Sequence, residues 1–120
     1  MSCEPYKFPV VRIVDIDGTI LPKKEIYNYL LLTNFSLPGA VEVLDRWFEE
    51  GNFIVLWTAR PEQYREQTII QLEKANISYH QLLMDKPYSD EIHIYDDKVI
   101  LSHKVVPNVG IGGLREEEKR

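Results

Sequence analysis

The stretch Val10-Val11-Arg12-Ile13-Val14-Asp15-Ile16-Asp17-Gly18-Thr19 is a short β-branched run that ends at two carboxylates. Such a run predicts a buried strand, and Gly18 allows a tight turn after it. Asp15 and Asp17 then stand two residues apart at a strand end, where one carboxylate can attack phosphorus and the other can carry the proton. In the alternative interpretation, both aspartates only cap backbone amides in a turn.

The rest of the chain alternates helical and strand patterns. Helices are predicted over about 40–50 and after Pro61, and strands over 53–57, 79–84, 91–95 and 105–111. The predicted inner faces of the two helices are Val41, Leu44, Trp47 and Phe48, and Ile69, Leu72 and Ala75. This alternation predicts a Rossmann-like α/β fold, a parallel sheet with helices on both faces in three layers (α/β/α). In such sheets ligands bind beyond the carboxyl ends of the strands.

Three further polar residues fall at or after predicted strand ends. Thr58 ends the second strand and can anchor a phosphate beside a helix N-terminus, or it can simply cap that helix. Arg60 can bind phosphate through two parallel hydrogen bonds, or it can be a surface charge. Lys86, after the third strand, can neutralise both a nucleophile and an incoming phosphate, although a lone loop lysine is usually solvated.

Asp96 and Asp97 form a second acidic pair, after the alternating run Ile92-His93-Ile94-Tyr95. Adjacent carboxylates repel each other, and a hard divalent cation relieves that repulsion. Ligands that are all oxygen favour Mg²⁺ over zinc. The other interpretation is an acidic turn. The three histidines show no spacing typical of zinc ligands.

Composition limits the classes of protein that fit. The chain has 120 residues, which predicts one domain over 1–120. Its net charge of −5 argues against a surface that tracks nucleic-acid backbones. Cys3 is the only cysteine, so no intramolecular disulfide can form. No signal peptide and no apolar run of membrane-spanning length is evident, so a cytoplasmic setting and no membrane partner are expected.

Taken together, the four motifs resemble the haloacid dehalogenase-like (HAD) hydrolase superfamily. They are Asp15-x-Asp17-Gly18-Thr19, Thr58, Lys86 and Asp96-Asp97, in this order over residues 10–97. The resemblance implies a phosphatase with an aspartyl-phosphate on Asp15 and acid–base catalysis by Asp17. It implies phosphate contacts from Thr58 and Lys86. Gly18, Thr19 and Arg60 are assigned to substrate binding, and Asp15, the Asp17 carbonyl, Asp96 and Asp97 to Mg²⁺.

The substrate stays open. The chain resembles short sugar- or capsule-related phosphatases and, more loosely, the 3′-phosphatase domains of polynucleotide kinases. A phosphorylated small molecule or a macromolecular phosphate ester is therefore expected, with nucleic acid only as a substrate. Short spacing between motifs predicts that no cap domain is present. The segment 20–37, with Tyr27, Tyr29 and Leu30 to Leu32, is a short helix or a flap and could serve a homo-oligomer contact.

Two other classes of protein share features with this sequence. A phospho-receiver domain has a similar length, acidic pocket, threonine and lysine. Its acidic pair lies on the first strand and its phosphorylated aspartate on a later one, which is not the order seen here. The second alternative is a phosphate-binding module without turnover.

Overall fold

The computed structural model describes residues 7–23 and 35–120, and within them three parallel strands form one sheet. The strands are β1 (Val11–Val14), β2 (Phe53–Trp57) and β3 (Gln81–Leu83), in the order β1-β2-β3. Val14 lies beside Leu56, and Leu56 lies beside Leu82, so all three strands leave the sheet at the same edge. The predicted α/β class with a parallel sheet is confirmed. The expected flap residues Tyr27, Tyr29 and Leu30 to Leu32 lie outside the described residues.

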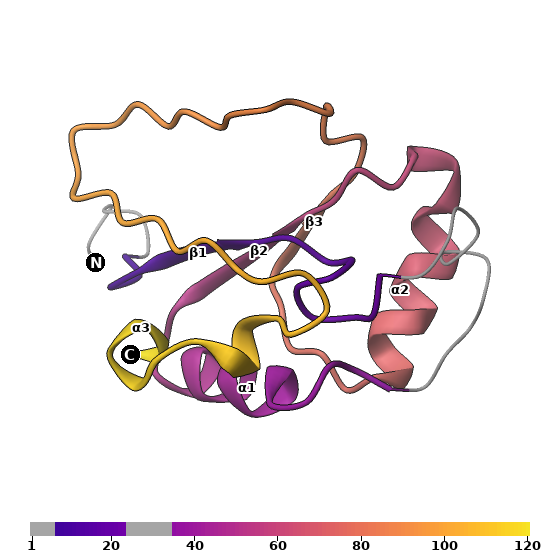
Figure 1. Cartoon of the computed structure of the whole chain (residues 1–120), viewed down its shortest axis with the longest axis horizontal. Helices are drawn as coiled ribbons and strands as arrows, with labels where there is room; N and C mark the ends of the chain where they lie inside the picture. The colour runs from indigo at the N-terminus through magenta and orange to yellow at the C-terminus, as the bar shows by residue number, and fades with distance from the viewer. Residues whose placement is uncertain (1–6, 24–34) are drawn as a thin grey trace, which may run out of the picture.

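Two long helices connect the strands (Figure 1). Helix α1 (Ala40–Glu49) begins after Gly39, whose φ is 82°, and its chain turns away at Gly51, whose φ is 81°. Helix α2 (Arg65–Lys74) follows a single 3-10 turn, η2 (Glu62–Tyr64). Two short elements, η3 (Ile111–Gly113) and α3 (Glu116–Lys119), end the chain. None of the described helices is long and apolar enough to span a bilayer.

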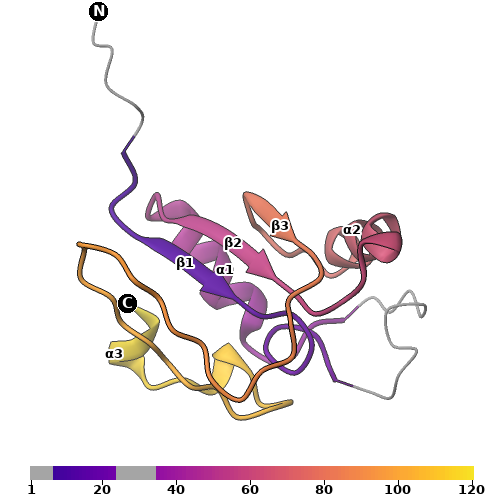
Figure 2. The same ribbon diagram turned by 90° about the horizontal axis from the view of Figure 1, so that it is seen from above.

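The core lies between one face of the sheet and these helices. Ile54 and Leu56 of β2 are fully buried there. They share a cluster with Leu44 of α1 and Leu72 of α2, so both long helices cover the same face (Figures 1 and 2). These two helices therefore form one layer, whereas the sequence predicts helices on both faces of the sheet. Each buried side chain of this size contributes about 1.5–3 kcal/mol. This face therefore supplies most of the burial that holds the three strand ends in register.

The predicted inner faces of the helices need two corrections. Phe48 is 43% exposed and Ile69 is 38% exposed, although both were expected in the core. On α2 the fully buried positions beside Leu72 are instead Thr68 and Gln71. A buried polar side chain requires a hydrogen-bond partner, and Arg60 is the partner of these two.

The predictions of strands over 91–95 and 105–111 are wrong. Residues 84–110 form a long irregular loop that lies on the side of the sheet away from α1 and follows the β1 edge (Figures 1 and 2). Ile92 and Ile94 alternate as a strand would, but they are 59% and 52% exposed. A period of two fits any extended chain, and a strand also needs a hydrogen-bonded neighbour. Among the described residues, β1 pairs only with β2.

The C-terminal segment 115–120 is hydrogen-bonded to β1 and α1. The Arg12 guanidinium lies 4.3 Å from the centre of the Trp47 ring, and burial lowers the pKa of Arg12. Arg12 Nη2 donates to the Arg120 carbonyl (2.7 Å), and Trp47 Nε1 donates to the Lys119 carbonyl (2.5 Å). These contacts explain how an arginine is accommodated on the helix side of β1.

Candidate active site

A cleft of about 400 Å³ opens at the carboxyl edge of the sheet, where α/β folds bind their ligands. Each strand contributes a predicted site residue to it: Asp15 follows β1, Thr58 follows β2 and Lys86 follows β3. The complete lining is Asp15, Asp17, Lys23, Thr58, Ala59, Arg60, Pro61, Lys86, Pro87, Tyr88, Ser89 and Ile92. The parallel sheet thus brings together residues up to 71 positions apart in the chain.

Asp15 is held by Lys86. Lys86 Nζ donates to Asp15 Oδ1 at 2.8 Å, and the side chains are 17% and 39% exposed respectively. The ammonium also lies 5.6 Å from the centre of the Trp57 ring, and the Lys86 amide donates to the Thr58 carbonyl at 2.9 Å. The lysine therefore has a fixed backbone and an aromatic support, and it occupies one oxygen of the carboxylate while leaving Oδ2 to other partners.

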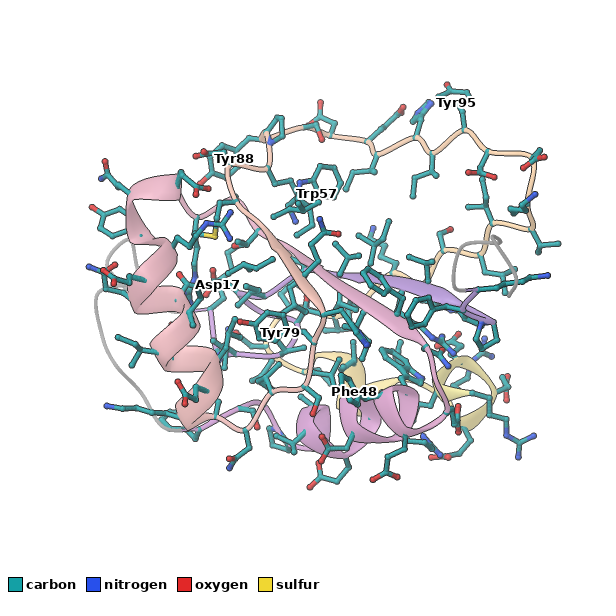
Figure 3. All side chains as sticks on the ribbon, turned by 180° about the vertical axis from the view of Figure 1, so that it is seen from behind. Asp17, Phe48, Trp57, Tyr79, Tyr88 and Tyr95 are labelled. Atoms are coloured by element: carbon teal, nitrogen blue, oxygen red, sulfur yellow. The ribbon has the colours of Figure 1, made fainter. Side chains whose placement is uncertain are left out.

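Asp17 is held by Arg60 in a bidentate ion pair. Arg60 Nε donates to Asp17 Oδ2 at 2.9 Å, and Nη2 donates to Oδ1 at 2.8 Å. The Arg60 side chain is 1% exposed, whereas that of Asp17 is 23% exposed. Figure 3 shows Asp17 on the side of the molecule next to α2. Two parallel bonds fix the plane of the carboxylate as well as its position.

Helix α2 anchors this arginine from the other side. Arg60 Nη1 donates to Thr68 Oγ1 at 3.1 Å and to Gln71 Oε1 at 2.6 Å. These bonds explain why α2 buries two polar residues where the sequence predicts an apolar face. The sequence also predicts a phosphate contact for Arg60, whereas the described hydrogen bonds of its guanidinium run to Asp17 and α2.

Thr58 is 1% exposed and lines the cleft, but its surroundings differ from the prediction of a helix N-terminus. Its Oγ1 accepts the Arg60 amide at 3.2 Å. Helix α2 begins only at Arg65, and the Glu62 amide at the start of η2 donates to Asp85 Oδ1. The Thr58 hydroxyl still borders the cleft and can donate a hydrogen bond to an oxyanion there.

Gly18 and Thr19 line a second cavity, of about 320 Å³, which adjoins the first. Gly18 has a φ of 85°, so the loop after β1 turns back on itself with the Gly18 amide bonded to the Leu21 carbonyl. The same turn brings Lys23 into the lining of both cavities. Lys23 was not predicted from the sequence, because nothing in its neighbourhood has a period that would place it at the cleft.

Asp96 and Asp97 lie away from both cavities. Asp97 pairs with Lys98 at 3.0 Å, and Asp96 Oδ1 accepts the Lys98 amide at 3.0 Å. Hydrogen bonds, first from Lys98 and then from Asp96, lower the pKa of Asp97. The lysine and open solvent thus relieve the repulsion for which the sequence argument invoked a metal. His93, also in this loop, is exposed and bonds to Glu91 and Tyr95.

No family model matches the chain, and no curated protein is similar enough to count as a match. Among solved structures, the chain is similar to part of two structures of a Pnkp1/Rnl/Hen1 RNA repair complex. One is 32% identical with a TM-score of 0.54 over 62% of this chain and 25% of that chain. The other is 26% identical with a TM-score of 0.57 over 76% and 33%. This chain therefore spans about a quarter to a third of those neighbours.

A crystal structure of a target protein from Vibrio cholerae also matches, at a TM-score of 0.58 over 92% of this chain and 93% of that chain. At 22% identity this likeness supports the fold alone. The three structures agree with the α/β architecture described above.

Proposed function

We propose that this chain is a phosphomonoester hydrolase of the HAD-like kind. The observation that carries the proposal is the pair of aspartates after β1, each held by its own cation at the edge of one cleft. Asp15 is in contact with Lys86, and Asp17 with Arg60. A carboxylate beside an ammonium and a threonine hydroxyl suits attack on a phosphate, because the cation offsets the charge of both anions.

The reaction would proceed in two steps. In the first, Asp17 takes up a proton from solvent as the substrate binds, an oxygen of Asp15 attacks phosphorus, the bond from phosphorus to the ester oxygen breaks, and Asp17 gives this proton to that oxygen. In the second, Asp17 takes a proton from water, the resulting hydroxide attacks phosphorus, and the bond to Asp15 breaks. Inorganic phosphate leaves, Asp17 releases its proton to solvent, and both aspartates return to their starting states.

Arg60 acts in this scheme as a positioning residue. Its two bonds to Asp17 hold that carboxylate beside the loop that carries Asp15. When one Asp17 oxygen is protonated, that oxygen can no longer accept its hydrogen bond from Arg60. We therefore expect one of the two bonds to be released as the ester oxygen arrives, while α2 keeps the guanidinium in place.

Magnesium belongs to the proposal on chemical grounds only. The described residues include no group of three acidic, histidine or cysteine side chains placed to hold a metal ion. Asp15 and Asp17 face cations, and Asp96 and Asp97 lie outside the cleft. This arrangement does not fit the predicted ligand set, so no step above depends on a metal. A role for Asp96 and Asp97 would require the loop 84–110 to follow another course.

The nature of the substrate is also a proposal. The likeness to an RNA repair complex supports phosphoester chemistry, and a sugar phosphate or a 3′-phosphate ester remain the two expected kinds of substrate. We propose cytoplasmic action without a cap domain. A phosphate-binding module without turnover would share this geometry, and only an activity assay separates it from an enzyme.

The test is hydrolysis of p-nitrophenyl phosphate by the whole chain and by two aspartate variants. Asp15→Asn should lose nearly all turnover because the amide is a poor nucleophile of almost the same shape. Asp90→Asn is the matched control, since Asp90 is exposed and lines neither cavity. Equal activity of the two variants would remove Asp15 from the mechanism. No hydrolysis by any form would favour the binding module.

A further inference from the structure

The second cavity is a continuation of the cleft rather than a separate site. Asp15, Asp17, Lys23 and Lys86 line both of them. The second cavity then extends between the loop after β1 and the segment 103–107, which adds His103 and Lys104 to its lining. A ligand bound at Asp15 therefore has space on two sides.

Hydrogen bonds join the two walls of the second cavity. The Asn108 side chain accepts the Lys23 amide at 2.5 Å and donates to the Lys23 carbonyl at 3.1 Å. The Asn108 amide donates to the Gly18 carbonyl at 2.8 Å, and the Ile111 amide donates to the Thr19 carbonyl at 3.0 Å. Asn108 has a φ of 64°, a conformation that asparagine tolerates better than most residues. Lys23 is thus held at the backbone on the rim.

The cavity is positively charged although the protein is not. Two carboxylates, Asp15 and Asp17, line the two cavities together with four cations, Lys23, Arg60, Lys86 and Lys104. Arg60 and Lys86 neutralise the aspartates. Neither Lys23 nor Lys104 forms an ion pair with a carboxylate in the described part of the chain. Counted over the described residues, the lining therefore has an excess of two positive charges, in a chain of net charge −5.

A cavity with a local excess of positive charge attracts anions. A single phosphate at Asp15 would contact Lys86 and Thr58, and it would leave Lys23 and Lys104 facing the second cavity. We propose that the second cavity, between Lys23 and Lys104, is a second anion subsite that binds another phosphate of the same substrate. The substrate class would then be phosphomonoesters that also carry a second phosphate group. This inference rests on the proposed function for its reaction but not for its binding.

Binding can be tested without turnover. The probes are propylphosphonate, which has one anionic group, and the ethylene-, propylene- and butylene-diphosphonates, which have two groups at increasing separation. None has a phosphate ester bond to hydrolyse. Calorimetric titration of the whole protein should show that at least one diphosphonate binds more tightly than propylphosphonate. Two exposed ion pairs predict a preference of roughly two- to thirtyfold, and it should shrink as salt is added.

Variants of the two lysines test whether Lys23 and Lys104 cause the preference for diphosphonates. The double variant with Lys23→Gln and Lys104→Gln should bind diphosphonates and propylphosphonate with similar affinity. Lys98→Gln is the matched control, because Lys98 is an exposed lysine in the same loop that lines neither cavity. It should keep the wild-type preference.

The possible results separate this inference from the proposed function. Equal affinities in the wild-type protein, or a preference that survives in the double variant, would overturn the second subsite. A preference that disappears equally in Lys98→Gln would overturn it too, because the effect would then follow total charge. A preserved preference without hydrolysis of any ester would support the subsite and reject the phosphatase.

Discussion

Replacement of Arg60 by methionine should be one of the most damaging single changes to this fold. Methionine has a similar length, but it cannot make the four hydrogen bonds of the guanidinium to Asp17, Thr68 and Gln71. Removal of one partner from a buried ion pair costs about 3–5 kcal/mol. Because the Asp17 side chain is 23% exposed and can reach water, we expect the lower part of this range, about 3 kcal/mol.

Arg65→Met is the matched control. Arg65 pairs with Glu62 in the same way, but these side chains are 39% and 58% exposed. Exposed pairs contribute about 0–1 kcal/mol, so this variant should unfold almost like the wild type. The assay is urea unfolding followed by the fluorescence of Trp47 and Trp57, which lie on α1 and β2.

Activity adds a second readout. Arg60→Met should lower kcat more than it raises KM, because the arginine positions Asp17 and makes no described contact that a phosphate would replace. If Arg60→Met fails to fold, Gln71→Leu removes one anchor and keeps the ion pair, with an expected loss of about 1 kcal/mol. Equal stability losses for Arg60→Met and Arg65→Met would refute the view that the buried pair organises the site.

Two further predictions concern the loop after β1 and the metal. Gly110→Ala would place a Cβ 2.3 Å from the Thr19 carbonyl oxygen, whereas at Gly51, also at positive φ, a Cβ meets nothing within 4 Å. Chemical unfolding should therefore show that Gly51→Ala lowers the free energy of unfolding by about 1–2 kcal/mol, and that Gly110→Ala lowers it by about 1–3 kcal/mol more. Equal losses would contradict the close approach of Gly110 to the Thr19 carbonyl. For the metal, hydrolysis of p-nitrophenyl phosphate should stop on chelation and return with Mg²⁺ only if the loop 84–110 takes another course that brings Asp96 and Asp97 to the cleft; with the described course, activity should survive exhaustive chelation.

Much of the fold could be predicted because it depends on local patterns. The β-branched runs before Asp15 and Thr58 form strands, and the helix between them ends near Gly51 as expected. Since parallel strands place their carboxyl ends at one edge, Asp15, Thr58 and Lys86 could be expected in one cleft. The structure bears out that juxtaposition.

The errors lie where contacts between distant segments decide the outcome. The alternation of Ile92 and Ile94 fits a strand, but no local pattern shows whether an extended segment finds a hydrogen-bonded neighbour. The polar face of α2 could not be predicted for a similar reason. Thr68 and Gln71 are buried only because Arg60, on another segment, supplies their hydrogen bonds. Lys23 reaches the cleft through its bonds to Asn108, 85 residues away.

The most direct test of the central claim is detection of a phosphorylated Asp15. The protein is mixed with p-nitrophenyl phosphate and Mg²⁺, quenched in acid within milliseconds and examined by peptide mass spectrometry. Asp17→Asn is included because it should slow attack by water and let the intermediate accumulate. We expect a single phosphoryl group on the peptide that contains Asp15, and none in Asp15→Asn. Turnover of the ester with no phosphorylated peptide in either form, or with the phosphoryl group on another residue, would contradict it.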